Sequence, residues 1–258
     1  MQPIDEVFPN PTVKQVVFQI QFPNLFFIES KIGDLQIKII DEFPESALIF
    51  QRGIVFAVGH EKNIESIQQN IPQEQAAKVW QFSNPPMGYV LHVASNALTI
   101  ISTSHKTYNN KQSGNRFRDI IVHVLKPFLD LTRLPTINRV GLRYIDECPF
   151  KEKTTTSFME HFNSCLSTTR FSIEDSIEQQ YVSFVKRNGH FLRYAEIYNA
   201  NINPTSVTLD FDGSANNVPS NDCLDVADQL HVLIVEEYKA TIKDPVYAYM
   251  RGERKDVH

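Results

Sequence analysis

The segment Ile137-Asn-Arg-Val-Gly-Leu-Arg-Tyr-Ile-Asp146 is the most informative stretch of this chain about its fold. Large apolar residues alternate along it with two arginines and a glycine: Val140, Leu142 and Tyr144 on one side, Arg139, Gly141 and Arg143 on the other. A period of two residues is typical of a β-strand with one buried and one accessible face. We therefore predict a strand over residues 138–147, with both arginines on the face opposite its apolar residues.

The same alternation recurs on both sides of this segment and predicts a chain rich in β-structure. The predicted strands cover residues 16–22, 47–58 (one or two strands broken at Gly53), 78–83, 89–103, 179–185, 191–198 and 206–211. Asn188-Gly189 is a strong hairpin signal between two of them, because both residues readily adopt the positive φ of a tight turn. A polar loop over residues 212–221 is expected after the last strand.

Three segments instead place apolar residues three and four positions apart, as in an amphipathic helix. They cover residues 28–43, 117–131 and 223–238. Pro127 lies inside the second segment and has no backbone N–H, so we expect a kink or a break there. The polar residues 59–77 are predicted to form a surface excursion with a short helix.

The order of these elements indicates that one unit occurs twice. The apolar residues of two predicted helices match at a constant offset of 106 positions: Phe117, Ile120, Ile121, Val124 and Phe128 correspond to Cys223, Val226, Ala227, Leu230 and Ile234. The alternative is a chance similarity between two amphipathic helices. We predict an α+β fold of two similar β-β-β-α halves, residues 1–150 and 151–258, packed as one compact unit. The sheets are expected to be mainly antiparallel, with helices on one face.

Composition and charge exclude several functional classes. Only nine of the 258 residues are glycine, and neither GxGxxG nor GxxxxGK[ST] occurs, which argues against dinucleotide and P-loop chemistry. The net charge of -5 gives no overall attraction for nucleic acid or anionic membranes. The three widely spaced cysteines fit a reducing cytosol, and no histidine pair has zinc-protease spacing. With neither a secretory signal nor a long apolar run, we expect a cytoplasmic protein without a membrane span.

Several segments together resemble one family of proteins. They are Val16–Pro44, the stretch around Trp80, Phe117–Phe128, Ile137–Asp146 and Leu224–Ile242. In order and spacing they are similar to a sporadically distributed family of uncharacterised prokaryotic proteins of roughly this length, and RVGLRYI is the most specific piece. The resemblance covers nearly the whole chain. It implies no catalytic residues, because the family has no agreed activity, but its patchy distribution implies a toxin–antitoxin or phage-defence context.

Arg139 and Arg143 are the candidate binding residues. A guanidinium group in a largely buried strand needs a partner such as a carboxylate or a phosphate. One interpretation is therefore an anion contact at the sheet. The other is a structural ion pair with Glu196, Asp210 or another acid, or a solvent-facing position on an open face of the sheet.

Asp210 and Asp212 are the weak catalytic candidates, together with Glu196 on the neighbouring predicted strand. Two carboxylates on one strand face can hold Mg²⁺ or Mn²⁺ for phosphodiester chemistry when a third joins them. The alternative is that Asp212 starts a turn and Asp210 pairs with a base such as Arg193. No metal ligand is assigned beyond this trio.

The sequence thus predicts a binding or interaction protein, and it favours a protein without enzymatic activity over an enzyme. We expect a protein partner or a second copy, with a homodimer favoured, no membrane and no cofactor. Nucleic acid is not favoured by the net charge. The alternative function is a metal-dependent nucleic-acid or nucleotide-processing enzyme that uses the carboxylate cluster and magnesium.

Overall fold

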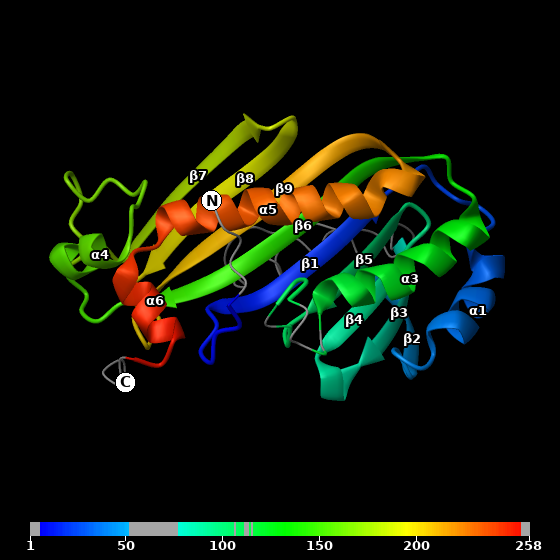
Figure 1. Cartoon of the computed structure of the whole chain (residues 1–258), viewed down its shortest axis with the longest axis horizontal. Helices are drawn as coiled ribbons and strands as arrows, with labels where there is room; N and C mark the ends of the chain where they lie inside the picture. Colours follow the sequence, from blue (N-terminus) through cyan, green and yellow to red (C-terminus); the bar gives the residue numbers. More distant parts are fainter. Residues whose placement is uncertain (1–5, 52–76, 106, 111–113, 115, 254–258) are drawn as a thin grey trace.

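The protein forms one nine-stranded antiparallel sheet with helices packed against it (Figure 1). The computed structural model describes residues 6–51, 77–105, 107–110, 114 and 116–253, so the predictions for residues 52–76 lie outside the described residues. The strands are β1 (Val13–Gln21), β2 (Glu45–Gln51), β3 (Ala77–Asn84), β4 (Tyr89–Val93), β5 (Ala97–Ser102), β6 (Thr136–Pro149), β7 (Glu178–Arg187), β8 (His190–Asn199) and β9 (Ser206–Pro219). Their order in the sheet is β2-β3-β4-β5-β1-β6-β9-β8-β7.

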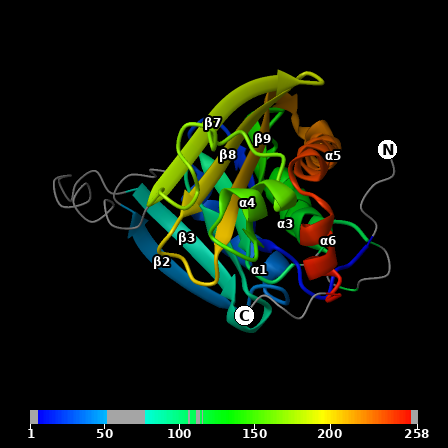
Figure 2. The ribbon, with the colours of Figure 1, turned by 90° about the vertical axis from the view of Figure 1, so that its left-hand side faces the viewer.

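Five α-helices accompany the sheet in the described part of the chain: α1 (Ile28–Ile39), α3 (Phe117–Thr132), α4 (Thr155–His161), α5 (Cys223–Thr241) and α6 (Asp244–Met250). Single 3₁₀ turns, η3 (Pro85–Met87) and η4 (Ser220–Asp222), precede β4 and α5. Figures 1 and 2 show α1, α3 and α5 on one face of the sheet, with α4 and α6 near one end of it. None of the described helices is long and apolar enough to cross a membrane.

The core lies between the sheet and these helices, as the alternation in the sequence requires. Phe18 and Ile20 of β1 and Val140 and Leu142 of β6 are fully buried there, and they pack in the same cluster as Val124 of α3. The opposite side chains of the same strands lie on a face that no described helix covers, which we call the open face (Figure 2). The predicted α+β class, antiparallel pairing and one-sided helices are confirmed.

The strand order makes the two halves equivalent around the central β1–β6 pair. From the centre outwards, one half reads β1-β5-β4-β3 and the other reads β6-β9-β8-β7, with β2 added at the edge of the first. This order groups β6 with the second half, whereas the division at residue 150 assigns it to the first. Both halves share one sheet and one core, and whether they arose by duplication stays a prediction.

The predicted polar loop after β9 was wrong, and the break that was one of two expectations at Pro127 does not occur; tertiary packing explains both. Residues 212–219 form the second part of β9 instead of a polar loop, because β6 is long enough to pair with them as far as Thr136 opposite Pro219. Helix α3 runs through Pro127 without a break. Its neighbours Val124, Leu125 and Phe128 are buried in the core, and this packing offsets the single backbone hydrogen bond that proline removes.

Candidate functional site

The predicted arginines lie on the open face, in a cluster with two aspartates. Arg143 on β6 and Arg193 on β8 flank β9 from either side, and both lie opposite Asp212 in the register. Their guanidinium groups reach along β9 to Asp210 instead. Arg143 donates from Nε and Nη2 to its two carboxylate oxygens at 2.7 and 2.9 Å, and Arg193 donates from Nη1 at 2.7 Å. Asp210 is only 3% exposed, so this is a buried carboxylate held between two cations.

Arg139 completes the cluster and lies four residues before Arg143 on the same face of β6. Its Nη2 donates to Asp212 at 2.8 Å, and its Nη1 donates to Gln19 of β1 at 3.4 Å. Gly141 makes this position possible. A Cβ atom added at Gly141 would lie 2.4 Å from Nη1 of Arg139, so the guanidinium group of Arg139 occupies the space that a side chain would take. Glycine at position 141 therefore leaves room for the side chain of Arg139. It is not needed for the backbone conformation, because its φ is not in the left-handed region.

The cluster has one cation more than it has anions. Three guanidinium groups face two carboxylates, and each guanidinium carries about five N–H donors. Within the described part of the chain, the hydrogen bonds of the cluster engage two donors of Arg139, two of Arg143 and one of Arg193. The side chains of all three arginines line a groove of about 250 Å³, whose other walls include Gln15, Gln21 and Thr99. This groove can accept a further anionic group.

An exposed apolar patch adjoins the cluster at the β7–β8 edge of the open face. It consists of Val182, Phe184 and Phe191. Phe184 is 77% exposed and lies directly opposite Arg193 in the β7–β8 register. Exposed apolar residues that gather beside polar groups are typical of surfaces that bind other proteins.

The three predicted carboxylates do not come together. Asp210 and Asp212 share the open face, but Glu196 pairs with Leu209 in the register and therefore lies on the face covered by the helices. It accepts hydrogen bonds from Tyr194 OH at 2.5 Å, from the backbone N of Cys165 at 2.9 Å and from Ser164 Oγ. No group of three His, Cys, Asp or Glu residues in the described chain is arranged to hold a metal ion. The ion-pair interpretation of Asp210 with Arg193 is confirmed.

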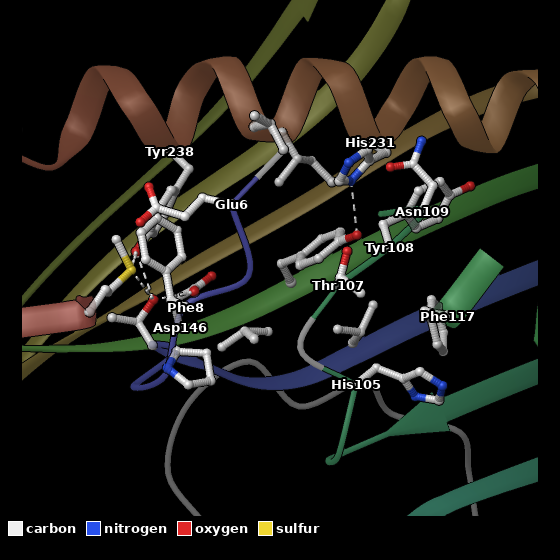
Figure 3. Close-up of a pocket in the computed structure, with 18 residues that line it drawn as sticks. Glu6, Phe8, His105, Thr107, Tyr108, Asn109, Phe117, Asp146, His231 and Tyr238 are labelled. Atoms are coloured by element: carbon white, nitrogen blue, oxygen red, sulfur yellow. Dashed lines mark hydrogen bonds between the residues drawn. The ribbon is translucent and has the colours of Figure 1, made fainter. Parts of the chain in front are cut away.

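A second site lies on the opposite face, where the two halves meet. It is a cavity of about 120 Å³ between α5, the strands β1 and β6, and residues 105 and 107–109, which follow β5 (Figure 3). Asp146 and Tyr238 lie at one end of it, and His231 and Tyr108 lie toward the other. Most of its lining is apolar or aromatic, which makes Asp146 its most unusual member.

Asp146 is 6% exposed and receives one hydrogen bond, from Thr12 Oγ1 to Oδ1 at 2.8 Å. Because the single hydroxyl proton of Thr12 is used in this way, Tyr238 OH donates to Thr12 across 2.7 Å. The result is a directed chain of hydrogen bonds from Tyr238 through Thr12 to the carboxylate. No described residue forms an ion pair with Asp146 or donates to its Oδ2. Burial raises the pKa of Asp146 to about 7.

The other end of the cavity is held by a network that joins the two halves. Arg118 of α3 forms a two-pronged ion pair with Asp228 of α5, with both shorter contacts at 2.8 Å. Tyr108 donates to the same aspartate at 2.8 Å, and its ring stacks on His231 with the centroids 4.2 Å apart. Tyr144 OH lies 3.0 Å from His231 Nδ1. Burial lowers the pKa of His231 to about 4, so its ring is neutral near neutral pH.

Sequence reasoning overlooked Asp146, although the signal was present. The alternation that places Val140, Leu142 and Tyr144 toward the core continues to residue 146, so a carboxylate falls on the buried face. A buried polar residue carries more information than the exposed apolar ones around it. The comparisons with protein-family models and with curated proteins gave no match. The resemblance to the sporadic prokaryotic family therefore stays a prediction.

Proposed function

We propose that this chain is a binding protein whose recognition surface is the open face of its sheet. The observation that carries the proposal is the groove in which three guanidinium groups share two carboxylates, beside an exposed apolar patch. The ligand that fits is an acidic side chain of a protein partner. Its carboxylate would take the spare donors of Arg139 and Arg143, while a neighbouring apolar residue would pack on Phe184.

The apolar patch favours a protein over a free anion as the occupant. A small anion needs only the groove, whereas the patch on β7 and β8 gains from burial only when a larger surface covers it. Nucleic acid is a weaker match. The chain carries a net charge of -5. Tyrosines on an open sheet face can stack bases, but Tyr181, Tyr194 and Tyr198 point to the helix-covered side. Tyr194 stacks there on Phe211, with the centroids 5.0 Å apart.

A displayed library of random peptides tests the proposal without knowledge of the natural partner. Selection on the full-length protein is expected to enrich peptides with Asp or Glu next to an apolar residue. Their affinity should fall at least about tenfold in Arg139→Met and in Phe184→Ser, because each variant removes one half of the surface. The matched controls are Arg187→Met and Phe26→Ser, exposed residues of the same types away from the open face, and they should bind as the wild type does.

Three results would contradict the proposal: no enrichment, enrichment of basic peptides, or binding that survives both open-face variants. Light scattering shows whether the partner is a second copy. A dimer that dissociates in Arg139→Met and Phe184→Ser, and persists in the two controls, assigns the surface to self-association. The toxin–antitoxin or phage-defence context belongs to the same proposal and rests on the resemblance alone. The identity of the neighbouring genes tests it.

The alternative function, a metal-dependent enzyme, requires Asp210, Asp212 and Glu196 to lie together, and they do not. Its three carboxylates point to opposite faces of the sheet, and Asp210 is engaged by two arginines. No other observation in the described residues favours it.

A further inference from the structure

The cavity beneath α5 contains a buried carboxyl group with an unused acceptor. Asp146 lines the cavity, and no described residue donates to its Oδ2 or pairs with it as a cation. Buried carboxylates in proteins are normally paired with a cation or saturated with hydrogen bonds. Asp210, on the other face of the same sheet, has both. The Oδ2 atom of Asp146 can therefore accept a hydrogen bond from a ligand.

The walls of the cavity restrict what that donor can be. Phe8, Tyr108, Phe117, Tyr144 and Tyr238 place aromatic rings around it, and Val13, Val16, Ile234 and Val235 add aliphatic surface. Aromatic faces attract cations and hydrocarbon alike, and they offer nothing to an anion. The volume of about 120 Å³ is somewhat smaller than the roughly 150 Å³ of an engineered cavity that binds benzene. A ligand of about five or six non-hydrogen atoms fits this space.

We propose that this cavity binds a small organic amine, whose ammonium group pairs with Asp146 while its hydrocarbon part packs against the aromatic walls. A metal ion is a poor occupant, because no group of three His, Cys, Asp or Glu residues in the described chain is arranged to hold one. Water is the competing occupant, since the space is large enough for about four molecules at roughly 30 Å³ each. The cavity is separate from the open face, so this proposal can be tested independently of the proposed protein-binding surface.

The charge state of Asp146 couples this binding to pH. With its pKa raised to about 7 by burial, Asp146 is largely protonated at about pH 5 and largely ionised at about pH 8. Other titratable or charged groups border the cavity or contact Tyr238: Glu6 with its partner Arg251, His105, Tyr108, Tyr144, Cys148, His231 and Tyr238. Burial raises the pKa of the Tyr108 and Tyr238 hydroxyls and of the Cys148 thiol, so these three stay neutral over this range. An ammonium ligand should therefore bind more tightly as the pH rises.

Isobutylamine and isobutanol are suitable probes, because they have nearly the same shape and differ in charge. NMR titration of the full-length protein at about pH 8 is expected to give at least about tenfold tighter binding of the amine than of the alcohol. In Asp146→Asn this preference should disappear, and at about pH 5 it should shrink by a similar factor in the wild type. Val235→Phe, which fills the cavity from α5, should abolish the binding of both probes and thereby locate the site.

The proposal is overturned if the wild type binds the amine no more tightly than the alcohol, or binds neither. It is also overturned if the preference survives in Asp146→Asn, or if Val235→Phe leaves it intact. Folding of each variant is checked by its NMR spectrum without ligand. Should Val235→Phe fail to fold, the chemical shift changes of Tyr144 and Ile234 amides on titration of the wild type locate the site instead.

Discussion

The replacement Asp146→Asn should make the protein more stable at high pH and leave it nearly unchanged at low pH. Well below pH 3.8 the carboxyl group is protonated in both the folded and the unfolded chain, so it makes no pH-dependent contribution. Between its ordinary pKa of 3.8 and its folded value of about 7, the unfolded chain releases the proton and the folded chain keeps it. The free energy of unfolding therefore decreases as the pH rises through this window.

The size of the effect follows from the pKa difference. At 1.36 kcal/mol per pKa unit, a rise from 3.8 to about 7 lowers the stability above pH 7 by about 4 kcal/mol. Asparagine keeps an acceptor for Thr12 and carries no charge, so it removes this penalty. We expect Asp146→Asn to raise the free energy of unfolding by about 2 to 4 kcal/mol at pH 8 and to change it by less than about 1 kcal/mol at pH 4.

Urea unfolding followed by circular dichroism at several pH values measures both numbers. Asp34→Asn is a matched control, because Asp34 is an exposed carboxylate in a surface pair with Lys31 and should contribute about 0.5 kcal/mol or less at either pH. The reasoning is refuted if Asp146→Asn destabilises the protein equally at pH 4 and pH 8. That result would mean that the carboxyl group titrates alike in the folded and unfolded chains.

Further predictions concern other groups. Burial lowers the pKa of His231 from 6.5 to about 4, so the free energy of unfolding should decrease as the pH falls from 6.5 to 4. The decrease is at most about 3 kcal/mol. In His231→Gln it should be absent from the same unfolding series. Asp210→Asn removes the shared partner of two guanidinium groups and should cost about 3 to 5 kcal/mol. Asp212→Asn breaks a single pair whose side chains are 24% and 29% exposed, and it should cost about 1 kcal/mol or less. Gly141→Ala should change stability by about 0.5 kcal/mol or less, yet displace the guanidinium of Arg139, which a crystal structure or its Nε NMR signal would show.

Much of the fold was predictable because its signals are local. The alternation in β1 and β6 and the hairpin at Asn188-Gly189 each depend on a few neighbouring residues, and the structure confirms all three. The errors arose where distant packing overrides local preference. Residues 212–219 contain Gly213 and several polar residues and resemble a loop, but β6 offers them a ladder of hydrogen bonds. The sequence of residues 212–219 does not itself indicate that they pair with β6.

The candidate site was predictable only in part, for the same reason. Arg139, Arg143, Asp210 and Asp212 were placed on strand faces correctly, since a period of two decides the face. Which of them meet depends on the sheet order, which brings Asp210 between two arginines. The register of β8 against β9 places Glu196 on the helix side, away from both aspartates. The cavity could not be predicted at all, because its walls come from six separated parts of the chain that only the complete fold assembles.

The two sites are consequences of one property of β6. Alternation sends its arginines to the open face, where they meet the carboxylates of β9, and sends Asp146 to the helix side together with Tyr144. Arg143 lies only three residues from Asp146 but on the other face of the sheet, so it cannot neutralise that carboxylate without breaking the ladder. The excess of cations on the open face and the unpaired acid in the cavity are thus linked. Among the described residues, the open-face cluster has one cation more than it has anions, and Asp146 in the cavity has no cation beside it. An acidic partner on one side and an amine on the other would supply the complementary charges.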